Sequence, residues 1–132
     1  MKTRTASCSC GLLTALTQGE PTRVSICHCL ACQRRTGSLF GAQARFLRTN
    51  VQIAGASTQW LRIGDEESKA TFHFCPTCGA TLYYATEGYD EEFVAIPVGA
   101  FAEPDFPAPT VSIYEERMHS WLGLPLGIEH IH

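Results

Sequence analysis

The sequence predicts a mainly β domain whose cysteines hold metal ions. Several short segments alternate apolar and polar residues with a period of two, which is the pattern of half-buried strands. Glycine, proline and acidic residues separate these segments and favour turns between them. The seven cysteines fall into clusters of two, three and two, with the close spacing that is typical of metal ligands.

Length and charge narrow the possible classes of protein. A chain of 132 residues fits one domain over 1–132 that can bury its own core. A net charge of −3 lacks the basic excess of a nucleic-acid binder. We find neither an apolar run near the ~20 residues that span a bilayer nor the apolar segment of a signal peptide. We therefore expect a cytoplasmic protein with no membrane or nucleic-acid partner, where reducing conditions favour metal binding over disulfides.

The first elements in chain order are two strands and a short helix. Residues 12–17 and 23–26 have strand character, and the turn residues 19–21 between them predict a hairpin. Residues 30–35 fit a short helical segment that ends at Gly37.

The rest of the chain is expected to add more strands, each with one buried face. We expect an ordered loop without regular structure at 99–109, because it contains three prolines, and this loop is a candidate lid. Residues 118–122, around Trp121, are expected to be exposed or to dock, and residues after 122 carry no clear signal. Solvated turns are expected at 64–68 and 88–90. The expected strands are 40–46, 51–53, 60–63, 69–74, 81–85, 93–98 and 111–114.

The central cluster has the features of a catalytic zinc site. Cys27, Cys29 and Cys32 supply three thiols within six residues. Catalytic zinc typically keeps three protein ligands and an open fourth position. The alternative is that these are inert core cysteines, but isolated core cysteines are not expected at this spacing. Arg34 and Arg35 follow directly and are candidate substrate-binding residues, since guanidinium groups pair with carboxylates; alternatively, they balance the negative charge of three thiolates.

The two outer pairs fit a closed structural zinc site. Cys8 and Cys10 precede a glycine, as do Cys75 and Cys78, and a glycine permits the tight turn that lets both sulfurs of a pair face one ion. Four outer and three central thiols account for all seven cysteines and predict two Zn²⁺ ions per chain. In the alternative, the central cluster takes a fourth thiol from one outer pair, and the other cysteine of that pair is left without a metal.

The histidines are weaker candidates than the cysteines. His28 lies between two expected ligands and points to the other side of an extended segment, so it is a candidate to support the site or to face the substrate. His73 is expected to be an ordinary strand residue. The three histidines nearer the C-terminus have no partner that the sequence reveals.

The cysteine motifs resemble those of the glutathione-dependent formaldehyde-activating enzyme family, which includes centromere protein V. The resemblance lies in C-x-C-G at 8–11, C-H-C-x-x-C-x-[RK]-x-x-G at 27–37 and C-P-x-C-G at 75–79, and continues more loosely through 98–101 to Trp121. It implies a β-tent fold of short antiparallel strands around a structural zinc. It also implies the same division of the cysteines: a structural ion on the outer four and a catalytic ion on the central three.

The resemblance implies a carbon–sulfur lyase or synthase that acts on a small thiol such as glutathione and on a carbonyl compound. The family reaction joins glutathione and formaldehyde into S-hydroxymethylglutathione. The alternative is a non-catalytic zinc-stabilised scaffold for a protein partner, which does not require a second cluster with three ligands. The oligomeric state and the identity of the substrates do not follow from the sequence.

Overall fold

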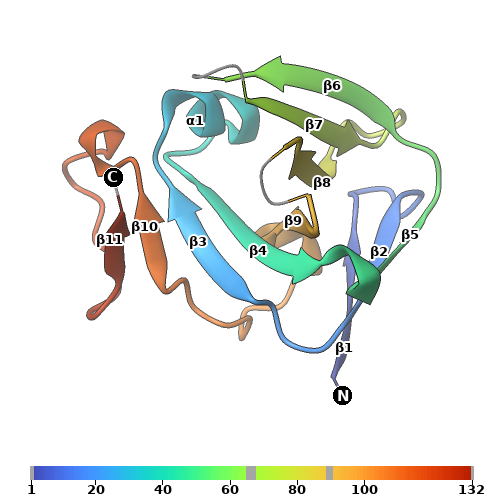
Figure 1. Cartoon of the computed structure of the whole chain (residues 1–132), viewed down its shortest axis with the longest axis horizontal. Coiled ribbons are helices and arrows are strands. Elements are labelled where there is room, and N and C mark those ends of the chain that lie inside the picture. Colours follow the sequence, from blue (N-terminus) through green and yellow to red (C-terminus); the bar gives the residue numbers. More distant parts are fainter. Residues whose placement is uncertain (1, 65–67, 89–90, 132) are drawn as a thin grey trace.

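Two β-sheets form the framework of the protein, seen in a computed structural model that describes residues 2–64, 68–88 and 91–131. Within these residues the small sheet has the strand order β1-β2-β5, and the large sheet has the order β11-β10-β3-β4-β9-β8-β7-β6 (Figure 1). Most neighbouring strands are antiparallel, as the alternating segments and connecting turns predict. The expected mainly β class is therefore confirmed.

The elements are short. The small sheet contains β1 (Thr3–Ser7), β2 (Thr14–Gln18) and β5 (Val51–Ala54). The large sheet contains β3 (Arg23–Cys27), β4 (Gly41–Leu47), β6 (Thr58–Ile63), β7 (Lys69–Phe74), β8 (Thr81–Thr86), β9 (Phe93–Pro97), β10 (Val111–Ile113) and β11 (Glu129–Ile131). The helical elements are α1 (Leu30–Thr36), η1 (Arg48–Asn50), η3 (Val98–Phe101) and η4 (Glu115–Arg117).

The main core lies between one face of the large sheet and the small sheet. Phe46, Leu82 and Ile96 from the large sheet are almost fully buried, and they share one cluster with residues of β1 and β2. Full burial of such a side chain contributes about 1.5–3 kcal/mol. Cys8 and Cys75 belong to the same cluster, so one of the cysteine groups is built into the core.

The opposite face of the large sheet carries polar residues. Side chains alternate along a strand, so Arg23, Ser25 and Cys27 of β3 share the face that does not enter this core. Helix α1 follows β3 and lies near β6 and β7 at the other end of the sheet order (Figure 1). The curl of the sheet therefore brings the central cysteines towards its far strands.

The predicted hairpin between residues 12–17 and 23–26 is wrong. β2 pairs with β1 and β5, whereas β3 pairs with β4 and β10, so the two strands belong to different sheets. The connection between them instead links the sheets: the Gly19 N–H donates to the Lys2 carbonyl (2.7 Å), and the Thr22 N–H donates to the Arg45 carbonyl (2.7 Å). Turn residues alone do not show which strands they join.

The first strand was not predicted, because its burial depends on distant partners. Arg4 of β1 is only 5% exposed. Its guanidinium pairs with Glu20 (3.0 Å) and Glu103 (3.3 Å) and lies 4.9 Å from the centre of the Phe106 ring. A buried charge needs such partners, and these come from two separate loops.

The proline-rich segment differs in part from the expected irregular loop. Its start belongs to η3, and Phe101 and Phe106 stack with ring centres 4.7 Å apart. Both rings are buried against the core. This packing argues against a freely moving lid. The expected turns at 64–68 and 88–90 include residues 65–67 and 89–90, which lie outside the described residues.

The last strands depart from the antiparallel pattern. β10 runs parallel to both β3 and β11, and β11 was not predicted. The expected burial within 51–53 holds only in part, since Val51 packs against the core but Ile53 is 38% exposed. Trp121 is 74% exposed, as expected for its segment. Within the described residues we find no helix with the length and apolar character needed to cross a membrane.

Candidate metal centres and the adjoining site

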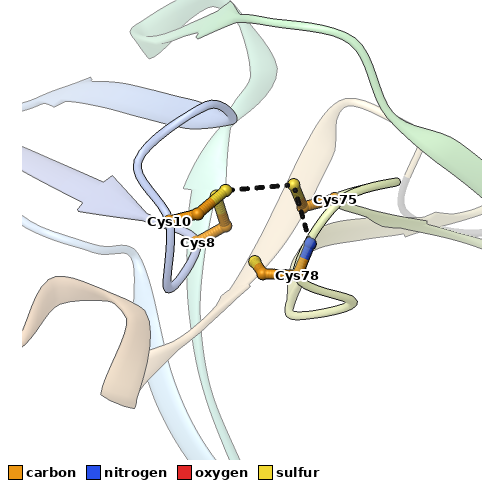
Figure 2. A group of neighbouring side chains, drawn as sticks. All are labelled: Cys8, Cys10, Cys75 and Cys78. Atoms are coloured by element: carbon orange, nitrogen blue, oxygen red, sulfur yellow. Dashed lines mark hydrogen bonds between the residues drawn. The ribbon is translucent and has the colours of Figure 1, made fainter.

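The outer cysteines converge into one group of four thiols (Figure 2). Cys8 and Cys10 follow β1, whereas Cys75 and Cys78 follow β7, so the group joins the two sheets. The Cys10 Sγ lies 3.7 Å from the Cys8 Sγ and 3.6 Å from the Cys75 Sγ. A tetrahedral zinc site with Zn–S bonds of about 2.3 Å has sulfurs about 3.8 Å apart, so these spacings fit zinc.

The two loops of this centre have similar local structures. Gly11 and Gly79 both have positive φ, 86° and 79°, as the tight turns require. Backbone N–H groups also donate to the sulfurs: the Leu13 N–H lies 3.3 Å from the Cys8 Sγ, and the Thr77 N–H lies 3.4 Å from the Cys75 Sγ. Such hydrogen bonds favour the thiolate form that binds a metal.

The central cysteines form a second group, whose sulfurs all lie within 4.8 Å of one another. Cys27 ends β3, Cys29 caps the N-terminus of α1, and Cys32 lies in the first turn of the helix. The Cys29 Sγ accepts a hydrogen bond from the Cys32 N–H (3.3 Å). The Gly37 C-cap has a φ of 68°, which confirms the predicted end of this short helix. We call this group the three-thiol centre.

Hydrogen bonds within the three-thiol centre distribute its charge unevenly. Hydrogen bonds with Cys27 and, to a smaller extent, with Cys32 lower the pKa of Cys29 to about 2. The contact with Cys29 raises the pKa of Cys27 above its ordinary value. Cys29 is therefore the first thiolate of the group, and the other two thiols donate to it.

Three side chains from different elements surround the three-thiol centre. The Arg35 guanidinium lies 5.0 Å from the centre of the Tyr84 ring and 5.2 Å from the centre of the Phe72 ring, and its charge favours the Cys32 thiolate. Arg62 on β6 similarly favours the Cys29 thiolate. Burial raises the pKa of Tyr84, and the neighbouring thiolates raise it further. The sequence did not single out Arg62 or Tyr84, since the strands that carry them reach the site only through the curl of the large sheet.

The close approach of α1 to β4 depends on a residue without a side chain. A Cβ at Gly41 would lie 3.1 Å from an Arg35 Nη atom and 3.4 Å from the Cys32 Cβ. Gly41 also pairs with Cys27 across β3 and β4. A glycine at this position therefore lets Arg35 lie directly beside the thiols.

The other predicted site residues differ in their accessibility. Arg34 is exposed on α1. His28 follows β3 and is fully buried, with its Nε2 3.0 Å from the Ser112 Oγ of β10. Burial lowers the pKa of His28. His73 stacks on Tyr83 with ring centres 4.1 Å apart, consistent with an ordinary strand residue.

Two cavities adjoin the residues around the three-thiol centre, since Arg35 lines one of them and Tyr84 lines the other. The first, the apolar cavity, has a volume of about 490 Å³, and the second, the polar cavity, has about 140 Å³. The apolar cavity is lined by Ala31, Arg34, Arg35, Trp60, Phe72, Phe74, Gly79 and Thr81. The polar cavity is lined by Arg23, Ser25, Gln43, Arg45, Tyr84, Ala85, Thr86, Phe93 and Ala95. The volume of the apolar cavity is typical of small-molecule sites.

Comparison with known families decides the membership of the chain. Residues 3–117 match the family described as glutathione-dependent formaldehyde-activating enzyme. The chain belongs to this family. The matched region contains all seven cysteines together with Arg34 and Arg35, so the resemblance seen in the motifs is confirmed. A comparison with curated proteins finds no match.

A solved structure supports the fold. The chain is similar to a protein from Rhodobacter sphaeroides, with 21% sequence identity and a TM-score of 0.56. The similarity covers 73% of this chain and 85% of that one. At this level of identity the likeness concerns the fold alone.

The two centres are expected to release bound metal at different rates. The four-thiol centre can surround an ion with sulfur, whereas the three-thiol centre leaves one position open to a competing ligand. We expect two zinc ions per chain after addition of zinc, and mild chelation should remove one of them before the far-ultraviolet circular dichroism signal changes. Metal analysis during a chelator titration measures this. A maximum of one ion per chain, even with zinc in excess, would contradict the division into four and three.

Proposed function

We propose that this protein is a zinc-dependent carbon–sulfur lyase or synthase that acts on glutathione, or a similar small thiol, and on a carbonyl compound such as formaldehyde. The observation that carries the proposal is the three-thiol centre, which lies near Arg35, Arg62 and Tyr84. Of these neighbours, Arg35 and Tyr84 each line a cavity. Family membership supports a reaction that involves glutathione and formaldehyde. The seven thiols suit a reducing compartment such as the cytoplasm.

The three-thiol centre fits a catalytic zinc ion by its donors. Three thiolates are soft ligands that suit zinc, and their sulfurs lie close enough to share one ion. When bound there, zinc would accept a substrate sulfur at its fourth position and favour its thiolate form. Cys27, Cys29 and Cys32 would hold the catalytic ion, and the four-thiol centre would hold a structural one.

The surrounding residues provide charge and hydrogen bonds for the reaction. Arg35 and Arg62 offset the negative charge that accumulates when thiolates gather in a partly buried site. Because the pKa of Tyr84 is raised, its hydroxyl stays protonated and can donate a hydrogen bond to an oxygen that gains negative charge. Arg34 lines the apolar cavity and can attract a substrate carboxylate.

The chemical step itself is an addition. The substrate sulfur gives an electron pair to the carbonyl carbon and forms the C–S bond, while the π pair of the C=O bond moves to oxygen. That oxygen then takes up one proton and becomes a hydroxyl group. The thiol has lost one proton, so the addition leaves the number of protons unchanged. The reverse sequence cleaves the C–S bond. A scaffold without catalysis would not need this second cluster, and no observation favours that alternative.

Cobalt-substituted protein provides a test that does not depend on turnover. We expect both glutathione and 2-mercaptoethanol to change the sulfur-to-metal charge-transfer absorption. Glutathione should bind more tightly because it also carries carboxylates. Arg34→Gln should weaken glutathione binding by up to about fivefold, the range of an exposed ion pair, with little effect on 2-mercaptoethanol.

The matched control is Lys69→Gln, which removes one positive charge from an exposed strand position outside both cavities. It should leave both affinities unchanged. If neither thiol alters the absorption, thiol binding at the three-thiol centre is ruled out. If Arg34→Gln binds glutathione as tightly as the parent protein does, thiol binding at the centre is still supported, but Arg34 does not bind the carboxylate.

A further inference from the structure

Three aromatic rings form a row across β6, β7 and β8. Trp60 pairs with Phe72 in the register of β6 and β7, and Phe72 pairs with Tyr84 in the register of β7 and β8. The Trp60 and Phe72 ring centres lie 5.9 Å apart, and the Phe72 and Tyr84 rings stack with centres 4.7 Å apart. Residues directly opposite each other on antiparallel strands project from the same face, so this aromatic row lies on one face of the large sheet.

The aromatic row connects the surface with the three-thiol centre. At its outer end Trp60 is 53% exposed. At its inner end Tyr84 lies near enough to the three thiols for their charges to act on it. The Arg35 guanidinium of α1 lies 5.2 Å from the centre of the Phe72 ring and 5.0 Å from that of Tyr84. A molecule held along the row can therefore reach the neighbourhood of the thiols.

The apolar cavity lies along the outer part of the aromatic row. Trp60 and Phe72 line it together with Phe74 of β7, and α1, which lies near these strands, adds Arg35 (Figure 1). None of the described residues that line the cavity is acidic. Rings favour offset or edge-to-face contacts with other rings, so this wall favours an aryl or other large apolar group.

Arg35 gives the apolar cavity a polar end beside the thiols. A Cβ at Gly41 would lie 3.1 Å from an Arg35 Nη atom and 3.4 Å from the Cys32 Cβ, so Arg35 is a direct neighbour of Cys32. The Arg35 Nε is buried and has no hydrogen-bond partner among the described residues. Buried donors in native proteins normally have an acceptor. A ligand with an apolar body and an oxygen acceptor fits both the rings and this donor.

Formaldehyde alone does not account for the size of the apolar cavity. The cavity has a volume of about 490 Å³. One water occupies about 30 Å³ in the liquid, and formaldehyde is only slightly larger than water. Formaldehyde also has no substituent that the rings could contact. The remaining space suits an apolar group attached to the carbonyl carbon.

We propose that the carbonyl substrate is an aldehyde with an aryl or similarly large apolar substituent. The apolar cavity holds this substituent against Trp60, Phe72 and Phe74, and the carbonyl oxygen accepts a hydrogen bond from Arg35. This inference rests on the proposed function, because it places the carbonyl carbon near the thiol substrate at the three-thiol centre. The bonds that form and break are those of the addition described above. Trp60 then determines specificity without taking part in the chemical step.

The thiol substrate does not need the apolar cavity. Arg34 is exposed and also lines a separate hollow over an adjacent face of α1. A carboxylate can reach Arg34 from that hollow while the aldehyde occupies the cavity. The other residues that line the hollow are Leu30, Gln33, Gly37, Ser38, Leu39 and His119.

Two aldehydes that differ only in a phenyl group test the proposal. The carbonyl carbon has the same immediate neighbours in propanal and in 3-phenylpropanal, so their uncatalysed reactions with a thiol are similar. With zinc-loaded protein and glutathione, kcat/KM for 3-phenylpropanal should exceed that for propanal by at least about tenfold, since one methylene in an apolar pocket is worth about 10–200-fold. Stopped-flow loss of the carbonyl absorption measures both rates, each corrected for the uncatalysed reaction.

Variants of the two tryptophans locate the preference. Trp60→Ala should lower the ratio of the two kcat/KM values by about twofold to tenfold, the range for one aromatic pair. Trp60→Phe keeps a ring and should retain most of the ratio. The matched control is Trp121→Ala, which removes a tryptophan that is 74% exposed and lines neither cavity. This control should leave the ratio at the parent value.

The outcomes separate this inference from the proposed function. Equal acceleration of both additions, or a parent ratio in Trp60→Ala, would overturn the inference and leave the proposed reaction intact. Acceleration with formaldehyde alone would do the same, whereas acceleration with no aldehyde would overturn both. The preference for 3-phenylpropanal should persist when 2-mercaptoethanol replaces glutathione. A preference that disappears with this thiol would assign the apolar cavity to the thiol substrate instead.

Discussion

A Cys78→Ser variant is expected to lose its stable fold at room temperature. Cys78 belongs to the centre that joins the loop after β1 to the loop after β7, and thereby links the two sheets. Apparent zinc binding contributes about 10–16 kcal/mol in zinc-finger peptides, which is comparable to the whole stability of a typical domain at about 5–15 kcal/mol. Two members of the centre also lie within the main core, so loss of the ion exposes polar sulfur where packing is tight.

Thermal melts and zinc content of the purified variant measure this loss. Cys29→Ser is the matched control, because it makes the same chemical change in the other centre. We expect Cys78→Ser to show no cooperative transition, or a Tm far below that of the control, together with loss of the tightly held ion. A Cys78→Ser protein as stable as Cys29→Ser would contradict the structural role of the four-thiol centre.

Local sequence signals predicted the cysteine centres because their geometry is itself largely local. Each pair is separated by one or two residues and ends in a glycine with positive φ, so the loop alone brings both sulfurs to one side. Ligand counting then favoured an arrangement in which the two pairs meet. The short helix from Leu30 was predicted for the same reason, since Gly37 marks its end.

The surroundings of the three-thiol centre depend on contacts that are distant in sequence. Tyr84 and Arg62 lie on β8 and β6, and no short-range pattern shows that the large sheet curls to bring them near α1. β1 was missed for a similar reason, since Arg4 is buried by partners from two loops. By contrast, Arg23 and Ser25 stand four and two residues before Cys27, so strand parity places them on the same face of β3 as Cys27.

The two centres should also respond differently to loss of a ligand, because only one of them is built into the core. Cys29 is partly exposed and caps a helix of seven residues. Serine is among the best N-cap residues, so its hydroxyl can take over the hydrogen bond from the Cys32 N–H that the sulfur accepts. Serine does not, however, provide a thiolate at neutral pH, whereas the pKa of Cys29 is about 2.

A Cys29→Ser variant is therefore expected to keep its fold and lose its chemistry. Its Tm should stay within a few degrees of the parent when both carry only the tightly held ion, because a retained cap changes stability by less than about 1 kcal/mol. Metal affinity at the three-thiol centre should fall by more than about a hundredfold, since even the partners that only orient a ligand are worth 10–100-fold. Competition with a chelator, cobalt absorption and the rate of S-hydroxymethylglutathione formation measure these changes. A variant that holds two ions and keeps the parent rate would show that Cys29 is not a ligand of the catalytic centre.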